Sequence, residues 1–362
     1  MRVHLPKKHL AETLAQVERI IPHRSSNPGL SLLNLELKDD TLIFRGSNLD
    51  LDIEATLKAD VEGEGQLAIP AQVFGQVVRA LPGELVELAL VDQELEIRSG
   101  SFDTRLQLSD PSSVPSLHFP DSYSGVLNGK LLGDALEHVR YASAVAEYQQ
   151  IFRGVKLELS DRKLRAIATD GFRLAYYHVD ETSGLEGDLV IPARSVDEMV
   201  RLLGNGEARL ELSEAQVSIA SGIYKLNVKL MEGTFPDYER VIPAQFLVTL
   251  SLDAKTFAET VARVAVMADK TANNRIDLFV KDGHLEITAE GAYGRSQEGL
   301  EVQQEGSESQ IALAYNAKYL TDALQHIDGR MRLSLSGTTS PSLLAGLDQP
   351  SYLAMVVPLR TG

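Results

Sequence analysis

Residue types that perform chemistry are sparse in this chain, and their spacing rarely suits a reactive site. There is no cysteine, which excludes disulfides, thiolate metal ligands and a thiol nucleophile. The eight histidines are scattered, and none forms a His-x-x-x-His pair of the kind that holds zinc. The sequence also lacks a phosphate-binding loop, Gly-x-Gly-x-x-Gly and Gly-x-Ser-x-Gly. We therefore expect no metal, no cofactor and no serine nucleophile.

One carboxylate and one imidazole could still act together as a base and an acid. Asp170 is followed by Gly171, and His178 lies further along the same segment. An Asp-Gly pair at the end of a strand is far more often a turn, which is the interpretation we favour. An enzyme remains the alternative, and turnover that disappears in Asp170→Ala would reveal it.

Length and composition describe an ordinary globular protein. The 362 residues are enough for two or three domains, with 44% apolar and 24% charged residues. No apolar run approaches the roughly 18 residues that a spanning helix needs, and the N-terminal residues lack a signal-peptide core. We expect a cytoplasmic protein with no membrane partner.

Two short segments recur three times at nearly constant spacing. Leu67–Ala71 returns 122 residues later as Leu189–Ala193 and, after a further 124 residues, as the weaker Leu313–Ala317. A second pattern, Leu-x-x-Lys-x-apolar, begins at Leu5, Leu127 and Leu252. Because two independent segments keep nearly one spacing, we infer three related modules of about 120 residues each.

Each of the six segments leads into apolar residues spaced i, i+4 and i+7, which predicts an amphipathic helix. These stripes are Leu10, Leu14, Val17; Phe74, Val78, Leu81; Leu132, Leu136, Val139; Val196, Val200, Leu203; Phe257, Val261, Val264; and Leu320, Leu324, Ile327. Between the helices, alternating segments flank Asp or Gly turns at 35–44, 157–167 and 278–287, which predicts hairpins with one buried face. The expected fold class is α+β, with two helices packed on antiparallel sheets in each module.

Proline-containing segments at 119–125 and 238–244 separate the repeats. We place module 1 at residues 1–121, module 2 at 126–244 and module 3 at 245–362.

The net charge of −16 argues against a conventional nucleic-acid binder, but the charge is unevenly distributed. The six helical segments hold 13 Lys and Arg against 10 Asp and Glu, whereas the rest holds 22 against 41. Basic residues recur at equivalent places, as at Lys8, Lys130 and Lys255. A weakly positive helical face inside an acidic shell would suit a protein that surrounds DNA without gripping it, because many phosphate contacts would make binding tight and steeply salt-dependent.

Three motifs resemble the bacterial DNA polymerase III beta subunit, the sliding clamp. They are Ala168–Ala175, Phe235–Pro243 and the ending Met355–Arg360, and they occur in the order that this family shows. The resemblance implies a DNA-clamp fold and a head-to-tail homodimer that closes a ring around duplex DNA. The implied partners are the replicative polymerase, the clamp loader, and other polymerases and repair factors that bind through a short peptide containing Gln and Leu or Phe.

The resemblance also implies a peptide pocket between modules 2 and 3. Its expected residues are Phe152, Thr169, Gly171, Phe172, Arg173, Leu174, Pro236, Arg240, Val241, Met355, Val356, Val357, Pro358, Leu359 and Arg360. Apolar side chains flanked by arginines would form a groove with donors for a peptide. The family often has His at the position of Phe172, and here Thr361 and Gly362 follow Arg360.

Two further sets of residues follow from the helical pattern and the resemblance together. The candidates for DNA contact are Arg24, Arg79, Tyr148, Gln149, Gln150, Arg194 and Arg201. The candidates for the interface between two copies are Val73, Phe74, Val266 and Met267, with pairing of two edge strands across it. A repeat scaffold that binds peptides but never encloses DNA shares every pocket residue, so it remains the second alternative.

Overall fold

The computed structural model describes residues 1–145, 150–160, 163–180 and 184–360. It divides into two compact units, one built mainly of Met1–Gly133 and Asp197–Leu230, the other of most of the remaining chain. Module 2 of the sequence contributes strands to both units. Among the described residues, no helix is long and apolar enough to cross a membrane.

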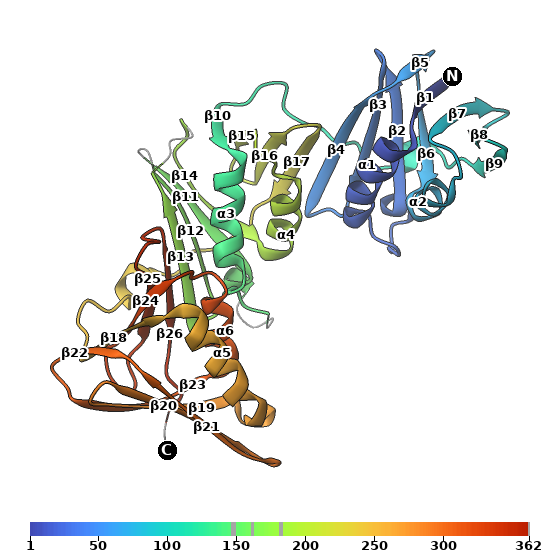
Figure 1. Ribbon diagram of the computed structural model, residues 1–362. Coiled ribbons are helices and arrows are strands. Elements are labelled where there is room, and N and C mark those ends of the chain that lie inside the picture. The colour runs from blue at the N-terminus through green and yellow to red at the C-terminus, as the bar shows by residue number, and fades with distance from the viewer. Residues whose placement is uncertain (146–149, 161–162, 181–183, 361–362) are drawn as a thin grey trace. The chain divides into compact units, whose positions relative to one another are not determined.

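The first unit contains two antiparallel sheets (Figure 1). The five-stranded sheet has the order β5 (Asp60–Glu62), β1 (Arg2–Pro6), β7 (Leu85–Val91), β8 (Glu94–Ser99) and β9 (Phe102–Gln107). The eight-stranded sheet has the order β10 (Gly125–Asn128), β15 (Glu207–Leu212), β16 (Gln216–Ser221), β17 (Tyr224–Lys229), β4 (Leu51–Lys58), β3 (Thr41–Ser47), β2 (Leu32–Lys38) and β6 (Gly65–Pro70). This larger sheet therefore joins modules 1 and 2 through the β17–β4 ladder.

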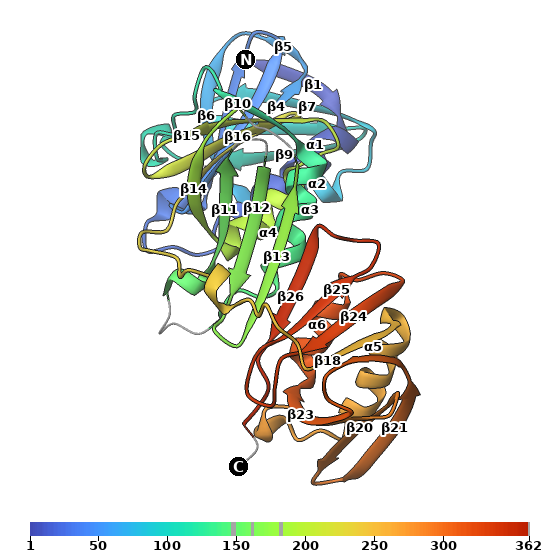
Figure 2. The same ribbon diagram turned by 90° about the vertical axis from the view of Figure 1, so that its left-hand side faces the viewer.

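The second unit repeats the arrangement. Its nine-stranded sheet has the order β14 (Gly187–Pro192), β11 (Gly154–Ser160), β12 (Lys163–Thr169), β13 (Arg173–Val179), β26 (Tyr352–Val356), β25 (Ser342–Gly346), β24 (Arg330–Leu335), β18 (Val248–Asp253) and β22 (Gln303–Gly306). Its four-stranded sheet has the order β21 (Gly294–Glu301), β20 (His284–Gly291), β19 (Arg275–Lys281) and β23 (Gln310–Asn316). Figure 2 shows β13 beside β26, the ladder that joins modules 2 and 3.

The part of the chain that the structure describes contains six α-helices, two for each module. They are α1 (Lys7–Ile20), α2 (Ala71–Ala80), α3 (Gly129–Arg140), α4 (Ala193–Leu202), α5 (Ala254–Val264) and α6 (Ala317–Leu324). In module 1, α1 packs against α2 and against β3 and β4, and in module 3 α5 packs against α6 and β20. Side-chain caps begin three of them: Asn128 accepts from the Lys130 amide, Asp253 from the Thr256 amide and Asn316 from the Lys318 amide.

The predicted helical stripes are confirmed in five of the six helical segments, where all three residues are buried. In α4 the prediction was partly wrong. Val196 is buried, but Met199 and Leu202 complete the buried face, while Val200 and Leu203 are only partly covered. Both patterns lie within the arc of a helical face, so periodicity alone could not separate them.

The three predicted hairpins are confirmed as β2–β3, β11–β12 and β19–β20. Positive φ angles at Asp39 and Asp40, and at Asp282 and Gly283, are those of tight two-residue turns between twisted strands. The repeat extends to the ladders between modules. Tyr224 lies opposite Ala55 in the first ladder, and Tyr352 lies opposite Tyr177 in the second, with five pairs in each.

Candidate peptide-binding site

The β13–β26 ladder places two kinds of side chain on its two faces, because successive residues of a strand point in opposite directions. Leu174 lies opposite Met355, and both face an apolar cluster on the outer side of the nine-stranded sheet. Arg173 lies opposite Val356, and these two face the helices. The predicted pocket residues of this ladder are therefore divided between a pocket floor and a helix-facing layer.

The segment that links modules 2 and 3 packs onto the same outer face. The buried members of the cluster are Ile167, Leu174, Val190, Phe235, Tyr238, Leu343 and Met355. The Tyr238 hydroxyl donates to Glu158 at 3.0 Å, and the ammonium group of Lys156 lies 5.8 Å from the centre of the Tyr238 ring. These contacts anchor the segment that carries Pro236, Arg240 and Val241, so the linker forms one wall of the site.

Burial and hydrogen bonds shift the pKa values in this wall. Burial chiefly, with the carboxylate of Glu158 beside it, raises the pKa of Tyr238 well above its usual range, so its hydroxyl stays protonated and remains a donor. The pKa of Glu158 is lowered, because hydrogen bonds from Lys156 and Tyr238 outweigh burial, the largest single effect, which acts to raise it.

A tight turn carries the most exposed apolar residue of the site. Asp170 accepts from the amides of Phe172 and Arg173 at 2.9 and 3.0 Å, and Gly171 has a φ of 87°. Phe172 is 54% exposed at the tip of this turn. Asp170 thus acts as a turn former, and none of its hydrogen bonds within the described residues reaches His178. The structure supports the turn and does not assemble the acid–base pair.

The C-terminal segment runs between the two modules. The Val357 amide donates to the Phe172 carbonyl at 2.9 Å, and the Leu359 amide donates to the Ala314 carbonyl of β23 at 2.7 Å. Pro358 is buried, Val357 and Leu359 are half-buried, and Arg360 is exposed. This segment borders the site beside Phe172, while Thr361 and Gly362 lie outside the described residues.

The three predicted arginines differ in their surroundings. The side chain of Arg240 is 85% exposed and forms an ion pair with Asp237 at 2.7 Å, while Arg360 is exposed. Arg173 is only 7% exposed, and Asp170 and Asp322 hold its guanidinium group at 3.0 and 2.6 Å. The prediction that Arg173 offers donors at the groove edge is therefore corrected, because its donors face inward and are occupied.

The remaining predicted members lie close to the same cluster. Val241 is 47% exposed, Thr169 is buried, and Pro236 is partly covered. The rings of Phe152 and Phe235 lie 6.3 Å apart, edge to face. The site therefore has a buried apolar floor, an exposed apolar edge at Phe172 and Val241, and a charged group at Arg240.

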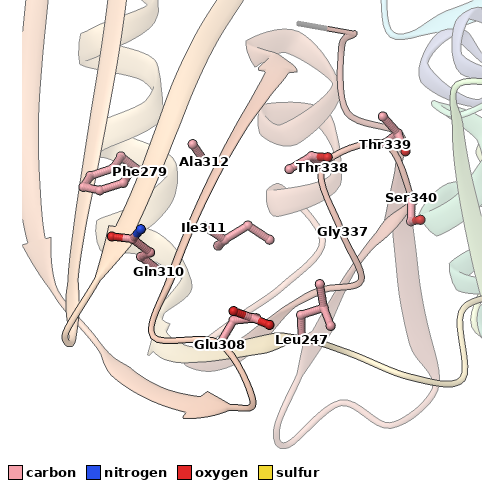
Figure 3. A pocket seen from close by; sticks show the side chains of 10 residues that line it. All are labelled: Leu247, Phe279, Glu308, Gln310, Ile311, Ala312, Gly337, Thr338, Thr339 and Ser340. Carbon is pink, nitrogen blue, oxygen red and sulfur yellow. The ribbon is translucent and has the colours of Figure 1, made fainter.

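The sequence did not indicate an open groove of about 550 Å³ on module 3. Figure 3 shows its lining from Phe279 of β19, from β23, from the 337–340 segment and from Leu247. β23 is an edge strand, and the C-terminal segment bonds to the same edge at Ala314. No motif marks these residues, which explains why sequence reasoning missed them.

The candidates for DNA contact lie on helices or beside them. Arg79 pairs with Glu18 at 2.5 Å, and Glu198 holds both Arg201 at 2.8 Å and Arg19 at 3.1 Å. Arg24 and Arg194 are exposed and form no ion pair with another described residue. Gln150 is exposed, whereas Tyr148 and Gln149 lie outside the described residues. Two of the four candidate arginines, Arg79 and Arg201, are therefore balanced by glutamate.

The candidates for the interface between copies are also separated by the structure. Val266 is 76% exposed, Val73 is 46% exposed and Met267 is partly covered. Phe74 is completely buried, as its own helical stripe requires. The prediction that Phe74 faces a second copy is corrected, because it belongs to the core of module 1.

Comparison with known proteins accounts for nearly the whole chain. Models of the DNA polymerase III beta subunit match residues 1–118 as its N-terminal domain, 126–237 as its central domain and 239–360 as its C-terminal domain. The chain belongs to the DNA polymerase III beta subunit family. A curated relative, the beta sliding clamp of Caulobacter vibrioides, is 29% identical over 99% of this chain and 100% of its own length.

Solved structures of the DNA polymerase III beta subunit family have the same fold. The beta subunit of Thermotoga maritima is 27% identical, with a TM-score of 0.92 and complete coverage of both chains. A Caulobacter crescentus beta sliding clamp has the same identity, TM-score and coverage, and is described with polyethylene glycol bound at the region ascribed to beta-motif tethering. The α+β clamp fold expected from the sequence is therefore confirmed.

Among the described residues, no site for a metal is evident. In the part of the chain that the structure describes, no group of three or more His, Cys, Asp or Glu side chains is arranged to hold an ion. The described residues of the candidate site instead offer apolar side chains and a few polar groups.

Proposed function

We propose that two copies of this chain, placed head to tail, form a closed ring around duplex DNA. The ring tethers the replicative polymerase, the clamp loader, and other polymerases and repair factors to the DNA through their short peptide motifs. The observation that carries the proposal is the pair of open sheet edges, β9 in module 1 and β21 in module 3.

These two edges are the repeat equivalents of strands that pair inside the chain. Phe102 is the first residue of β9 after the β8–β9 turn, as Tyr224 is in β17 after the β16–β17 turn. Glu298 of β21 lies opposite the fourth residue of β20, as Ala55 of β4 lies opposite the fourth residue of β3. Since Tyr224 pairs with Ala55, the same ladder would pair Phe102 with Glu298 of a second copy.

Antiparallel pairing then determines the rest of the register between copies. Thr104 would lie opposite the second copy's Ser296, and Leu106 opposite its Gly294. Pairing of this kind would satisfy the open backbone groups of both edges, which otherwise invite uncontrolled association. A head-to-tail contact of this kind produces a ring when the rotation between copies closes.

Exposed apolar side chains flank the two edges. Val266 follows α5 as Tyr141 follows α3, and Val73 is the third residue of α2 as Tyr319 is of α6. At the junction of modules 2 and 3, Tyr141 and Tyr319 both lie against the guanidinium group of Arg173. Val73 and Val266, with Met267, would accordingly meet across the interface between copies and cover each other there.

The peptide motifs would bind at the site between modules 2 and 3. We assign the floor to Leu174 and Met355, the edge to Phe172 and Val241, and a peptide-facing charge to Arg240. The equivalent junction of modules 1 and 2 is polar, since Asp52 and Asn227 replace Leu174 and Met355. The Asp52 carboxylate accepts from Ser47 at 2.6 Å, and the Asn227 side chain donates to the His118 carbonyl at 2.9 Å. This contrast favours one peptide pocket in each chain.

Retention on DNA would come from closure of the ring rather than from affinity. Arg79 and Arg201 are already paired with glutamates, so few counterions would be released when DNA enters. Arg24, Arg194 and Gln150 remain available for transient contacts with phosphates. We infer no catalytic activity and a cytoplasmic location beside the nucleoid, and we keep the module boundaries at 1–121, 126–244 and 245–362.

The decisive experiment places the protein on a nicked circular plasmid with its clamp loader and then linearises the DNA. Gel filtration follows the complex before and after the cut. A ring stays on the circles through moderate salt and is lost from the open ends. A complex that stays on linear DNA, or that never survives salt on circles, would contradict the ring and favour the peptide-binding scaffold.

A further inference from the structure

Arg173 lies on the face of the β13–β26 ladder opposite the pocket floor. It is the first residue of β13, and its side chain points toward the helices while that of Leu174 points into the outer cluster. Arg173 therefore belongs to the same short segment as the pocket without facing the space where a peptide would lie.

Four groups surround the Arg173 guanidinium. Its Nε donates to Asp170 at 3.0 Å, and its Nη1 donates to Asp322 of α6 at 2.6 Å. The rings of Tyr141 and Tyr319 lie 5.4 and 4.6 Å from it. The two carboxylates outweigh the effect of burial, the largest single effect on this group, and the pKa of Arg173 is raised further. The group is thus a charged link between module 2 and module 3.

Asp170 connects this link to the exposed edge of the pocket. One of its oxygens accepts from the amides of Phe172 and Arg173, and the other accepts from the Arg173 guanidinium. The Phe172 carbonyl in turn accepts from the Val357 amide of the C-terminal segment. A displacement of Arg173 would be transmitted through Asp170 to Phe172 and to the segment that borders the site.

A role for Arg173 in direct peptide binding would require breaking its contact with Asp322. Asp322 is partly buried, and its remaining ion-pair partner is the mostly exposed Lys318 at 2.9 Å. Separating a covered ion pair leaves both charges poorly compensated, which costs more than a surface pair gains. Arg240, exposed and at the pocket edge, can contact a peptide without this cost.

We propose that Arg173 is a positioning residue that ties the 169–173 turn to α6 and so holds the peptide site in its binding geometry. This inference rests on the proposed peptide site, which it deepens. Arg173 and Asp322 then act as one unit. Removing either would alter the site by the same amount, although Asp322 lies on the helix side of the ladder.

The chain contains no tryptophan, so Phe172→Trp supplies a single fluorescent indole at the pocket edge. In this background we would compare Arg173→Met, Asp322→Asn, the double variant and Arg173→Lys. The probe is a fluorescein-labelled five-residue peptide that contains Gln, Leu and Phe. The emission of the introduced indole is recorded without peptide and peptide affinity is measured with it, both far below the melting temperature of each variant.

We expect Arg173→Met and Asp322→Asn each to weaken the peptide by about fivefold and to shift the indole emission alike. The double variant should bind the peptide no more weakly than either single variant, because both substitutions break the same contact between Arg173 and Asp322. Arg173→Lys, which keeps a charge beside Asp322, should recover part of the loss. Arg240→Ala is the matched control: it should weaken the peptide without moving the indole emission of the free protein.

Two results would overturn the inference. If Arg173→Met weakens the peptide while Asp322→Asn does not, Arg173 binds the peptide directly. If the indole emission is unchanged in both variants, the turn is not held by this pair. Failure of the unsubstituted chain to bind the peptide at all would overturn the proposed site, and the indole emission without peptide would still decide the positioning role.

Discussion

The hydroxyl groups of Tyr141 and Tyr352 lie 2.7 Å apart and join module 2 to module 3 on the helix side of the β13–β26 ladder. Tyr352 also donates to the Ala323 carbonyl of α6 at 3.2 Å. Since a phenol has one proton and a carbonyl can only accept, Tyr141 must be the donor in the bond to Tyr352. Tyr352 is therefore the central member of a chain of two hydrogen bonds.

The order of the two bonds predicts unequal effects of removing each hydroxyl. Tyr141→Phe should lower the free energy of unfolding by about 1 kcal/mol, because it removes one bond and leaves Tyr352 its second partner. Tyr352→Phe should cost about 2 kcal/mol or more, because it removes both bonds and leaves the Tyr141 hydroxyl without an acceptor. Urea unfolding measures both, with the fully exposed Tyr293→Phe as a neutral control. Equal losses would contradict this arrangement.

Replacing Gly75 in α2 by alanine should change the stability of the protein in the direction opposite to that expected for a helical glycine. An alanine in place of a helical glycine normally stabilises by up to about 1 kcal/mol. At Gly75 an added Cβ would lie 1.7 Å from the Glu18 carboxylate, which is buried between α1 and α2. Gly75→Ala should therefore destabilise the protein by about 1–3 kcal/mol, measured by urea unfolding.

A glycine in another helix, α3, supplies a control for this substitution. At Gly133 in α3, an added Cβ would meet a single atom, the Leu203 Cβ at 3.9 Å, so Gly133→Ala should stabilise. Adding Glu18→Ala to Gly75→Ala should restore most of the loss, because it removes the atoms that clash. A stabilising Gly75→Ala would show that Glu18 is not held where the structure places it.

His326 predicts a pH dependence of stability. Burial chiefly, with His138 beside it, lowers the pKa of His326 to about 4, although Asp322 acts in the opposite direction. The unfolded chain, with a pKa near 6.5, then binds more protons than the folded chain at intermediate pH. The contribution of the neutral His326 side chain to the free energy of unfolding is complete above about pH 6.5 and is lost as the pH falls toward 4.

Replacing His326 should remove this acid sensitivity in part. His326→Gln should lose less stability than the parent chain between about pH 7 and pH 4.5, as followed by the urea midpoint. The groups that face His326 are His138, Tyr141 and Tyr352, whose rings lie 5.0–5.8 Å away, together with Asp322. His23→Gln, at an exposed position, serves as the control for replacing a histidine by glutamine.

The sequence predicted the repeat, the hairpins and most helical faces because each depends on residues close together in the chain. Phe74 shows that two predictions can conflict. The apolar stripe of its helix placed Phe74 in the core, whereas the family resemblance suggested that it lies at the interface between copies. The burial of Arg173 was out of reach, because its partner Asp322 is 149 residues away and no local pattern connects them. The groove beside β23 likewise depends on which strands lie at sheet edges, which periodicity does not show.

The register proposed between β9 and β21 predicts a specific covalent dimer. Asp103 follows Phe102, and Gln297 precedes Glu298, so these two exposed residues would lie opposite each other in different copies. Facing residues of an antiparallel pair are about 4.5–5.5 Å apart between Cα atoms, a separation that a disulfide can bridge. The chain has no cysteine of its own to interfere.

Asp103→Cys combined with Gln297→Cys should form disulfide-linked dimers under mild oxidation, seen by non-reducing electrophoresis and reversed by a thiol. The matched control, Asp103→Cys with Glu301→Cys, keeps both cysteines on exposed positions but places them four residues out of register. Because a ring of two chains has two such contacts, the product should be a dimer that does not extend into longer chains. Ladders of higher oligomers would contradict ring closure, and equal yields from both pairs would contradict the register.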